Sequence, residues 1–218
     1  MTNLVDRPKS SRGDRRREQL VEAGLALLSE HGWPGITARA VAERAGTNAG
    51  LIHYHFGGLP GLHAAIFRRG TDLLVNPLVD ELLAAEDERA ALDAIRMLLP
   101  RTAADEPASR PAADGVPASG PIAGDEDGSR LAAELIIGAT RDPALGAMLR
   151  DELRRARQHI ADRLRVRHPG WAAGHAAGVA TLIVAAIDGL MLHRMIDGEL
   201  PVGEALDVAQ GLLPVEER

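Results

Sequence analysis

The chain has 218 residues, a mass of 23.1 kDa and a hydrophobic fraction of 45%, which suffices for one large domain or two modest ones with a packed core. It contains no cysteine, which excludes a disulfide scaffold, a thiolate metal site and a cysteine nucleophile. No apolar run approaches the roughly 18 uncharged residues of a membrane span, and the first residues lack the apolar core of a signal peptide, so we expect a cytoplasmic protein with no membrane partner.

Charge is distributed unevenly along the chain. Residues 1–70 contain 10 Lys and Arg against 6 Asp and Glu, whereas residues 71–218 contain 15 against 25, so a basic segment precedes an acidic one. A phosphate-binding module attached to a separate body has this distribution, because attraction to a polyanion is local and is screened within about 10 Å. An uneven spread without functional meaning is the alternative.

The N-terminal segment has the pattern of a small helical domain. We expect residues 1–14 to form a disordered basic tail and residues 15–31 to form a first helix, because apolar residues recur there every three or four positions. Thr37 is a suitable N-cap for a second helix over residues 38–45, which Gly46 ends.

A third short helix and a longer fourth helix follow. The third is expected over residues 48–55, and Pro60 suits the first position of the fourth, which should extend to about Glu81. Pro77 should kink or break this fourth helix. We therefore place a domain boundary after the third helix, so that residues 15–60 form the first domain.

The remaining residues, 61–218, predict a helical bundle interrupted by a long loop. Residues 101–128 are rich in Pro, Gly, Ser and Asp and bury too little apolar surface to offset ordering entropy, so we expect them to be disordered. Further helices are predicted over residues 88–99, 129–141, 143–168, 171–197 and from 201 onward. No alternating strand pattern of useful length appears, so the expected fold is all-α: a three-helix head joined to a helical bundle of about six helices.

The two short helices joined by a tight glycine turn form a helix-turn-helix candidate, although such hairpins also occur in ordinary bundles. The specific residues are Gly35-Ile36-Thr37, Val41-Ala42, Ala45-Gly46 and the run from Gly50 to Phe56. They resemble the DNA-binding head of the TetR family of bacterial transcriptional regulators, over roughly residues 15–67. The resemblance implies a dimeric repressor that binds a near-palindromic DNA operator and is released by a small-molecule effector. The alternative is that the protein activates transcription instead of repressing it.

The candidate DNA contacts lie on the outer face of the third helix and at the start of the second. Asn48 can hydrogen-bond a base edge, Leu51 can contact a thymine methyl group, and hydroxyls and imidazoles can reach phosphates. Thr37 presents a helix N-terminus to a phosphate, and Arg39 follows where the family often has a backbone contact. The candidate DNA-binding residues are Thr37, Arg39, Thr47, Asn48, Ala49, Leu51, His53, Tyr54 and His55.

Some of these residues have a structural alternative, and two positions depart from the family pattern. Tyr54 and His55 could pack inside the head, and Asn48 could serve only as a cap. The family usually has a tyrosine where this chain has His53 and a lysine where it has Leu59, which removes an expected phosphate contact. Basic residues near the start of the first helix could replace that contact or form a solvated face: Arg12, Arg15, Arg16 and Arg17.

The C-terminal two thirds resemble the family less specifically. The landmarks are Asp142-Pro143-Ala144-Leu145 and Ala186-Ile187-Asp188-Gly189-Leu190. The resemblance implies that the helix over residues 171–197 and the helix from residue 201 onward form a four-helix interface between two subunits. This would explain why helix 171–197 is apolar on more than one face; the core of a lone bundle is the alternative. Such a dimer sets its two recognition helices about 34–36 Å apart. The candidate interface residues are Val179, Ile183, Ala186, Leu190, Leu206 and Leu213.

The resemblance also implies an effector pocket among the helices over residues 88–99, 129–141, 143–168 and 171–197. Because Trp171 is the one aromatic residue after residue 70, we expect a mainly aliphatic lining and a small apolar or amphipathic effector. The candidate polar residues of this pocket are Arg96, Glu134, His159 and His175, and a surface or structural role is the alternative for each.

Signals for metals, cofactors and catalysis are weak. The histidines of the C-terminal part lack the spacing of three or four residues that pairs metal ligands on a helix, and no nucleophile elbow, Walker motif or dinucleotide glycine pattern appears. We therefore expect no enzyme, no metal site and no cofactor. The alternative function is a helical small-molecule-binding or catalytic bundle that has lost DNA binding, which the departures at His53 and Leu59 would favour.

Overall fold

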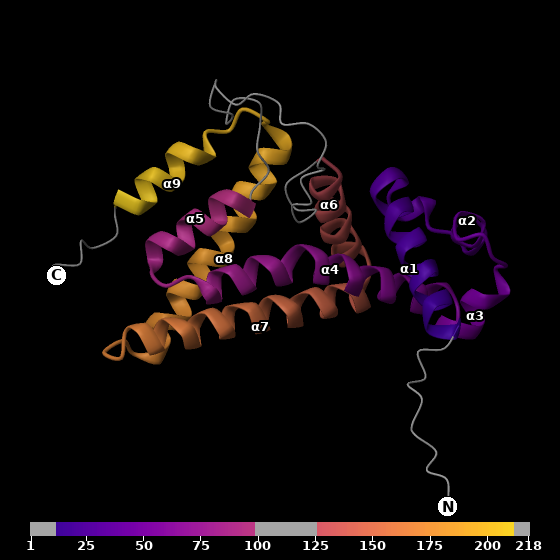
Figure 1. Ribbon diagram of the computed structural model, residues 1–218, viewed down its shortest axis with the longest axis horizontal. Coiled ribbons are helices and arrows are strands. Elements are labelled where there is room, and N and C mark those ends of the chain that lie inside the picture. Colours follow the sequence, from indigo (N-terminus) through magenta and orange to yellow (C-terminus); the bar gives the residue numbers. More distant parts are fainter. Residues whose placement is uncertain (1–11, 99–125, 212–218) are drawn as a thin grey trace, which may run out of the picture. The chain divides into compact units, whose positions relative to one another are not determined.

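The computed structural model describes residues 12–98 and 126–211, and every regular element in these residues is a helix (Figure 1). The all-α prediction is therefore confirmed. The elements are α1 (Arg12–His31), the 3-10 helix η1 (Trp33–Gly35), α2 (Ala38–Arg44), α3 (Gly50–Phe56), α4 (Leu59–Ala84), α5 (Glu88–Leu98), α6 (Glu126–Arg141), α7 (Pro143–Arg167), α8 (Ala173–Ile196) and α9 (Val202–Gly211).

Two predicted segments differ at their edges from the structure. The tail was expected to reach residue 14, but α1 begins at Arg12; the loop was expected to reach residue 128, but α6 begins at Glu126. Both helices start earlier than hydrophobic periodicity indicates, because polar residues can extend a helix by a turn that contributes nothing to the apolar stripe. The rest of the predicted tail and loop lies outside the described residues.

The chain divides into two compact units, residues 1–70 and 71–218. The first unit contains α1, α2, α3 and the first turns of α4. Its most deeply buried side chains are Leu20, Leu28, Val41, Ile52, Leu62, Ile66 and Phe67. The predicted boundary after residue 60 is about ten residues too early, because Leu62, Ile66 and Phe67 bury their apolar side chains in the head.

Helix α4 continues through Pro77 and ends at Ala84, so of the two predicted effects of this proline the break is excluded, and the kink stays a prediction. A proline inside a helix removes one backbone hydrogen bond and costs about 3 kcal/mol. Leu74 and Leu82 are both buried on either side of it. Burial of such side chains contributes roughly 1.5–3 kcal/mol each, which is enough to hold the helix together across the defect.

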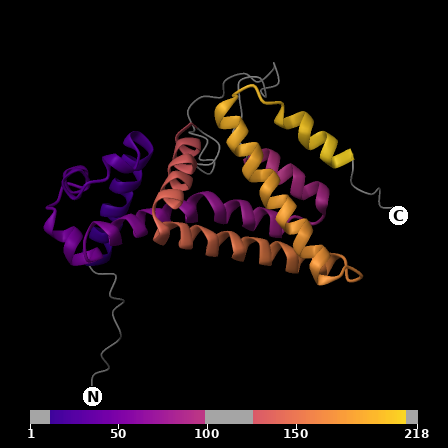
Figure 2. The same ribbon diagram turned by 180° about the vertical axis from the view of Figure 1, so that it is seen from behind.

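In the second unit α6 and α8 both pack against α7, and α9 packs against α5 (Figures 1 and 2). Its core contains Leu82, Ile95, Ile160, Ala161, Leu164, Ala176, Ala180, Ile187, Val202 and Leu206. The helix predicted over residues 143–168 is confirmed as α7, and its Leu145, Ala156, Ile160 and Leu164 are buried. Ile160 and Leu164 belong to the core of the unit, so the apolar face of this helix is turned inward.

Candidate DNA-binding site

A short turn holds α2 and α3 together. Val41, Ala42 and Ile52 are buried between the two helices and the rest of the head. Gly46 ends α2 with a φ of 60°, a left-handed conformation that favours glycine, and the Thr47 N–H donates to the Ala42 carbonyl at 2.9 Å. The hydrogen-bonded turn and the buried apolar contacts fix the angle at which α3 leaves α2.

Asn48 closes the start of α3. Its Oδ1 accepts a hydrogen bond from the Gly50 N–H at 2.7 Å, which leaves Asn48 outside the helix and explains why α3 begins at Gly50 instead of residue 48 as predicted. The side chain is nevertheless exposed, and this bond uses only its amide oxygen. Capping and base contact are therefore compatible, because the amide nitrogen can still donate to a base edge.

The outer face of α3 is exposed and polar. The Tyr54 side chain is 80% exposed, so the alternative that it packs inside the head is excluded. His53 and Ala49 are also exposed, whereas His55 is half-buried with its ring edge-on to Tyr54 at a centroid distance of 4.9 Å. Thr47 and Leu51, the other predicted contacts on this segment, are half-buried. A continuous face of α3 is thus available to a partner.

The start of α2 presents the remaining predicted contacts. The Thr37 hydroxyl oxygen accepts a hydrogen bond from the Ala40 N–H at 3.1 Å, which makes Thr37 the N-cap as predicted. Because the cap occupies only the oxygen, the hydroxyl hydrogen can still donate to a phosphate. Thr37 and Arg39 are both exposed.

The junction between α3 and α4 contains two close approaches to Phe56, by Gly61 and by Arg17, that sequence reasoning missed. Gly57 and Gly58 have φ of 70° and 123°. A Cβ atom placed on Gly61 would lie 1.9 Å from the Phe56 carbonyl oxygen, so only glycine permits this close approach of α4 to the end of α3. On the other side, the Arg17 guanidinium lies 5.2 Å from the centre of the Phe56 ring, a cation–π contact from α1. A glycine at position 61, one turn into a helix, was the available signal.

Part of the head's positive charge is neutralised internally. Arg44 forms a two-pronged ion pair with Glu30, and the hydrogen bond from Arg44 holds the pKa of Glu30 below its ordinary value. Arg69 donates a hydrogen bond to Glu22 at 2.7 Å. Arg15 and Arg39 are exposed. The side chain of Arg12 lies outside the described residues.

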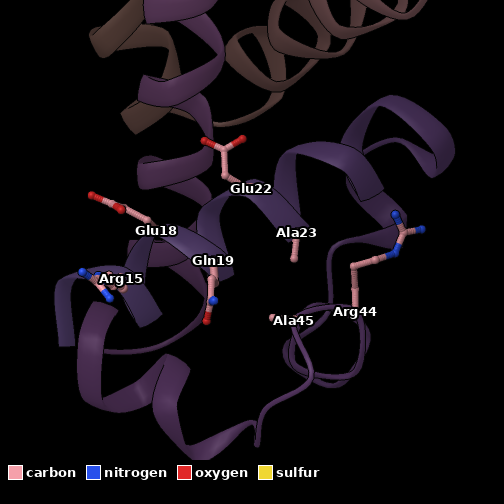
Figure 3. A pocket seen from close by; sticks show the side chains of 7 residues that line it. All are labelled: Arg15, Glu18, Gln19, Glu22, Ala23, Arg44 and Ala45. Atoms are coloured by element: carbon pink, nitrogen blue, oxygen red, sulfur yellow. The ribbon is translucent and has the colours of Figure 1, made fainter. Parts of the chain in front are cut away.

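A groove of about 590 Å³ runs between α1 and the end of α2 (Figure 3). Its lining residues are Arg15, Glu18, Gln19, Glu22, Ala23, Arg44 and Ala45. Acidic and basic side chains alternate around it, and Glu22 and Arg44 are already paired with other residues of the head. The groove therefore offers no excess charge of either sign, and it contains none of the residues predicted to bind an effector.

The four predicted effector-binding residues are spread over four helices. Arg96 on α5 forms an ion pair with Asp207 on α9. Glu134 is half-buried on α6, whereas His159 on α7 and His175 on α8 are exposed. Exposed side chains do not line an enclosed cavity, so the position of the effector pocket stays a prediction.

In the described part of the chain no group of three or more metal-binding side chains was found.

The predicted dimer interface needs correction in one respect. Leu206 is 4% exposed and belongs to the core of its own unit, where the packing of α9 on α5 covers it. Val179, Ile183 and Leu190 are half-buried against the same core, and Ala186 is exposed. Leu213 lies outside the described residues.

The exposed apolar face of α8 is a different one. Its apolar and small residues follow each other at intervals of three and four: Leu182, Ala185, Gly189, Leu192 and Ile196. Leu182 is 71% and Ile196 is 79% exposed. Within the described residues α8 is also long and apolar enough, by length and composition, to cross a membrane, and 17% of that stretch is buried. Core helices of soluble proteins pass the same test of length and composition.

This geometry, a capped helix-turn-helix whose second helix is exposed on its outer face, defines the class of helix-turn-helix DNA-binding proteins. Residues 20–66 match the family model of the bacterial regulatory proteins of the tetR family, and residues 110–215 match that of the tetracyclin repressor-like C-terminal domain. The chain belongs to the TetR family, which consists of transcriptional regulators and not of enzymes.

Individual relatives agree with this assignment. The HTH-type transcriptional regulator BetI of Burkholderia ambifaria is 36% identical over 89 residues, 40% of this chain, and that alignment spans only 46% of the relative. The BetI of Burkholderia mallei is 28% identical over 88% of both chains. The crystal structure of a regulator from Saccharomonospora viridis in complex with choline has the same fold, with a TM-score of 0.65 and 22% identity over 94% of this chain and 100% of that one.

Proposed function

We propose that this protein is a dimeric transcriptional repressor that binds a near-palindromic DNA operator through α3 and is released by a small-molecule effector. The observation that carries the proposal is the exposed outer face of α3, on which Tyr54 is 80% exposed. On the inner side, the buried residues Val41, Ala42 and Ile52 fix the helix to the rest of the head. A helix held in this way can enter a major groove without rearrangement of the head. Operator binding also places the protein in the cytoplasm, where bacterial DNA lies.

The proposed dimer forms through α8 together with α9. The exposed stripe from Leu182 to Ile196 has the spacing of a helix that packs against another helix, and Val208 on α9 adds an apolar side chain that is 65% exposed. An apolar stripe of this length is unfavourable in water, and a second copy of the same stripe covers it symmetrically. We assign the interface to this stripe, with Ala186 at its edge.

The proposed effector is a small apolar or amphipathic molecule bound in the second unit. The one aromatic side chain of that unit, Trp171, is stacked on His168 at a centroid distance of 4.2 Å, so aliphatic side chains must supply most of a pocket's lining. The choline complex of the structural relative supports a compact organic ligand. An effector that prefers the DNA-incompetent state about a hundredfold supplies about 2.7 kcal/mol, enough to vacate a marginally occupied operator.

The test is competition binding with the full-length protein. A labelled duplex from the DNA flanking the gene is titrated with protein in the presence of excess random duplex, followed by fluorescence anisotropy. We expect the wild type to prefer the flanking duplex and the variant with Asn48→Ala and Tyr54→Ala to lose this preference by about 30-fold or more, since base contacts contribute about 1–3 kcal/mol each. Val166→Ala, at an exposed position of α7, is the matched control and should bind like the wild type.

A further inference from the structure

Helix α7 carries two arginines on the side that faces the core of its unit. Around the helix axis, Arg163 and Arg167 lie about 60° and about 20° from Ile160, which is buried. Leu164, on the same side of α7, is buried as well. Apolar residues usually occupy such positions, because a charged group loses its hydration when it is buried. Arginines on this side of α7 therefore need a specific partner.

Both guanidinium groups contain a buried donor without an acceptor. The Nε–H groups of Arg163 and Arg167 are buried and make no hydrogen bond. The Arg163 side chain is half-buried, and it forms no hydrogen bond or ion pair with any of the described residues. Native proteins leave few buried polar atoms unpaired, because each one costs the free energy of its lost hydration. Two such donors within one helical turn indicate a common acceptor.

The turn between α4 and α5 holds Arg167 in place. Its Nη2 donates to the Ala85 carbonyl oxygen, and its Nη1 lies 3.6 Å from Glu88 Oε1. The same Glu88 oxygen lies 3.0 Å from His168 Nε2. These contacts engage the outer nitrogens of Arg167 and leave its Nε–H for another acceptor. Because residues four positions apart on a helix are neighbours, one small anion can reach both Arg163 and Arg167.

The charges around the two arginines leave a positive charge uncompensated. Glu88 balances Arg167, whereas no described carboxylate pairs with Arg163. Burial raises the pKa of Asp188 on α8, and the opposing positive charge is that of Arg157, not that of Arg163. The other acidic residues of α7 and of the end of α4 are exposed or already paired with arginines: Asp80, Glu81, Asp151, Glu152 and Asp162.

We propose that Arg163, together with Arg167, binds the carboxylate of the effector, which is an organic monocarboxylate with an aliphatic chain. This inference rests on the proposed function and narrows the chemical class of its effector. A carboxylate has two oxygens that can accept the two Nε–H groups, and its single charge matches the uncompensated positive charge. The core that α7 shares with α4 and α5 contains Leu82 and Ile95, so aliphatic side chains are at hand for a hydrocarbon chain.

Isothermal titration calorimetry with the full-length protein measures the binding of butanoate, octanoate and dodecanoate without DNA. Octanol, which has the chain of octanoate without its charge, and choline, an organic cation, are the comparison ligands. We expect the wild type to bind at least one carboxylate about tenfold or more tightly than octanol, because charge-assisted hydrogen bonds are among the stronger ones. Choline should not bind. The same carboxylate should release the protein from the flanking duplex in the anisotropy assay.

Arg163→Met separates ligand binding from folding, because methionine is long and flexible but uncharged. This variant should bind the carboxylate about tenfold or more weakly and bind octanol like the wild type. Without ligand its Tm should equal or exceed that of the wild type, because a half-buried charge without a partner is removed, whereas a purely structural arginine would lower the Tm when replaced. Arg163→Lys should recover part of the affinity, because it restores the charge without the Nε–H.

Arg150→Met, at an exposed position of the same helix, is the matched control and should bind the carboxylate like the wild type. Carboxylates that bind no better than octanol overturn the inference, and so does carboxylate binding that Arg163→Met leaves unchanged. Binding of choline in place of the carboxylates overturns it as well.

Failure of the proposed function is seen separately, because ligand binding is measured without DNA. A wild type that prefers the flanking duplex but binds no carboxylate overturns this inference alone. A wild type that binds a carboxylate through Arg163 but binds no duplex supports the site and contradicts the proposed function. Carboxylate binding that does not release the flanking duplex contradicts the assignment of this ligand as the effector.

Discussion

Gly61 on α4 lies so close to Phe56 at the end of α3 that a Cβ atom on Gly61 would be 1.9 Å from the Phe56 carbonyl oxygen. The carbonyl belongs to the backbone and cannot move aside as a flexible side chain can. The contact therefore couples the position of the recognition helix to the start of α4, and it makes position 61 the most sensitive glycine of the head.

Gly61→Ala should destabilise the head by about 2 kcal/mol or more, because the overlap forces α3 and α4 apart. DNA affinity should fall with it. The matched control is Gly174→Ala in the first turn of α8, where an added Cβ atom meets nothing within 4 Å. This substitution should be neutral or should stabilise the fold by about 0.5–1 kcal/mol. Thermal unfolding and duplex binding of both variants check this; equal behaviour of the two would contradict the proposed role of the contact.

Leu182→Glu with Leu192→Glu should convert the proposed dimer to monomers. Both side chains are exposed in a single protomer, so the fold of each protomer should persist, while charges opposite one another across a two-fold interface repel. Sedimentation velocity measures the mass, and Val166→Glu, exposed on α7, is the control for an added surface charge. A dimer that persists in the double variant would place the interface elsewhere.

Glu88 should make the protein sensitive to acid. Burial raises the pKa of Glu88, but the hydrogen bond with His168, at 3.0 Å, and the nearby Arg167 outweigh it, so the pKa lies below its ordinary value of 4.5. A carboxylate with a lowered pKa in the folded state stabilises above its unfolded pKa, and that stability is lost as the pH falls through the folded pKa.

Glu88→Gln should therefore reduce the free energy of unfolding by about 1 kcal/mol near neutral pH and flatten its decline below about pH 4.5. Urea unfolding followed by circular dichroism at several pH values measures both effects. Glu86→Gln, at an exposed position in the turn between α4 and α5, is the control. If both variants show the same pH profile as the wild type, the pair of Glu88 and His168 does not contribute to stability.

The sequence predicts the helical architecture and most of the candidate site because those features rest on local signals. Thr37 is a helix cap because its hydroxyl can accept a backbone hydrogen bond and it directly precedes an apolar stripe. Gly46 ends a helix because glycine, unlike other residues, adopts a positive φ without steric strain. Tyr54 lies two residues after Ile52, which is buried, so the helical period turns the Tyr54 side chain to the opposite, outer face of α3. These relationships lie within a few residues along the chain.

Features that depend on contacts between distant elements were not predictable in this way. Helix α8 is apolar nearly all round, so periodicity cannot tell which face meets α7, and Leu182 rather than Ile183 proved to be exposed. Leu206 has the spacing of an interface residue, but α5 covers it. The Phe56–Gly61 contact depends on how α4 approaches α3, which single-sequence patterns do not contain.

The most direct test of DNA binding through α3 is the salt dependence of affinity for the DNA flanking the gene. If a dimer neutralises about six to ten phosphates, the logarithm of the association constant should fall with the logarithm of salt concentration with a slope of about −5 to −9. Tyr54→Ala should lower the affinity for the flanking duplex at every salt concentration. A wild-type protein that binds neither flanking nor random duplex, even at low salt, would contradict the account.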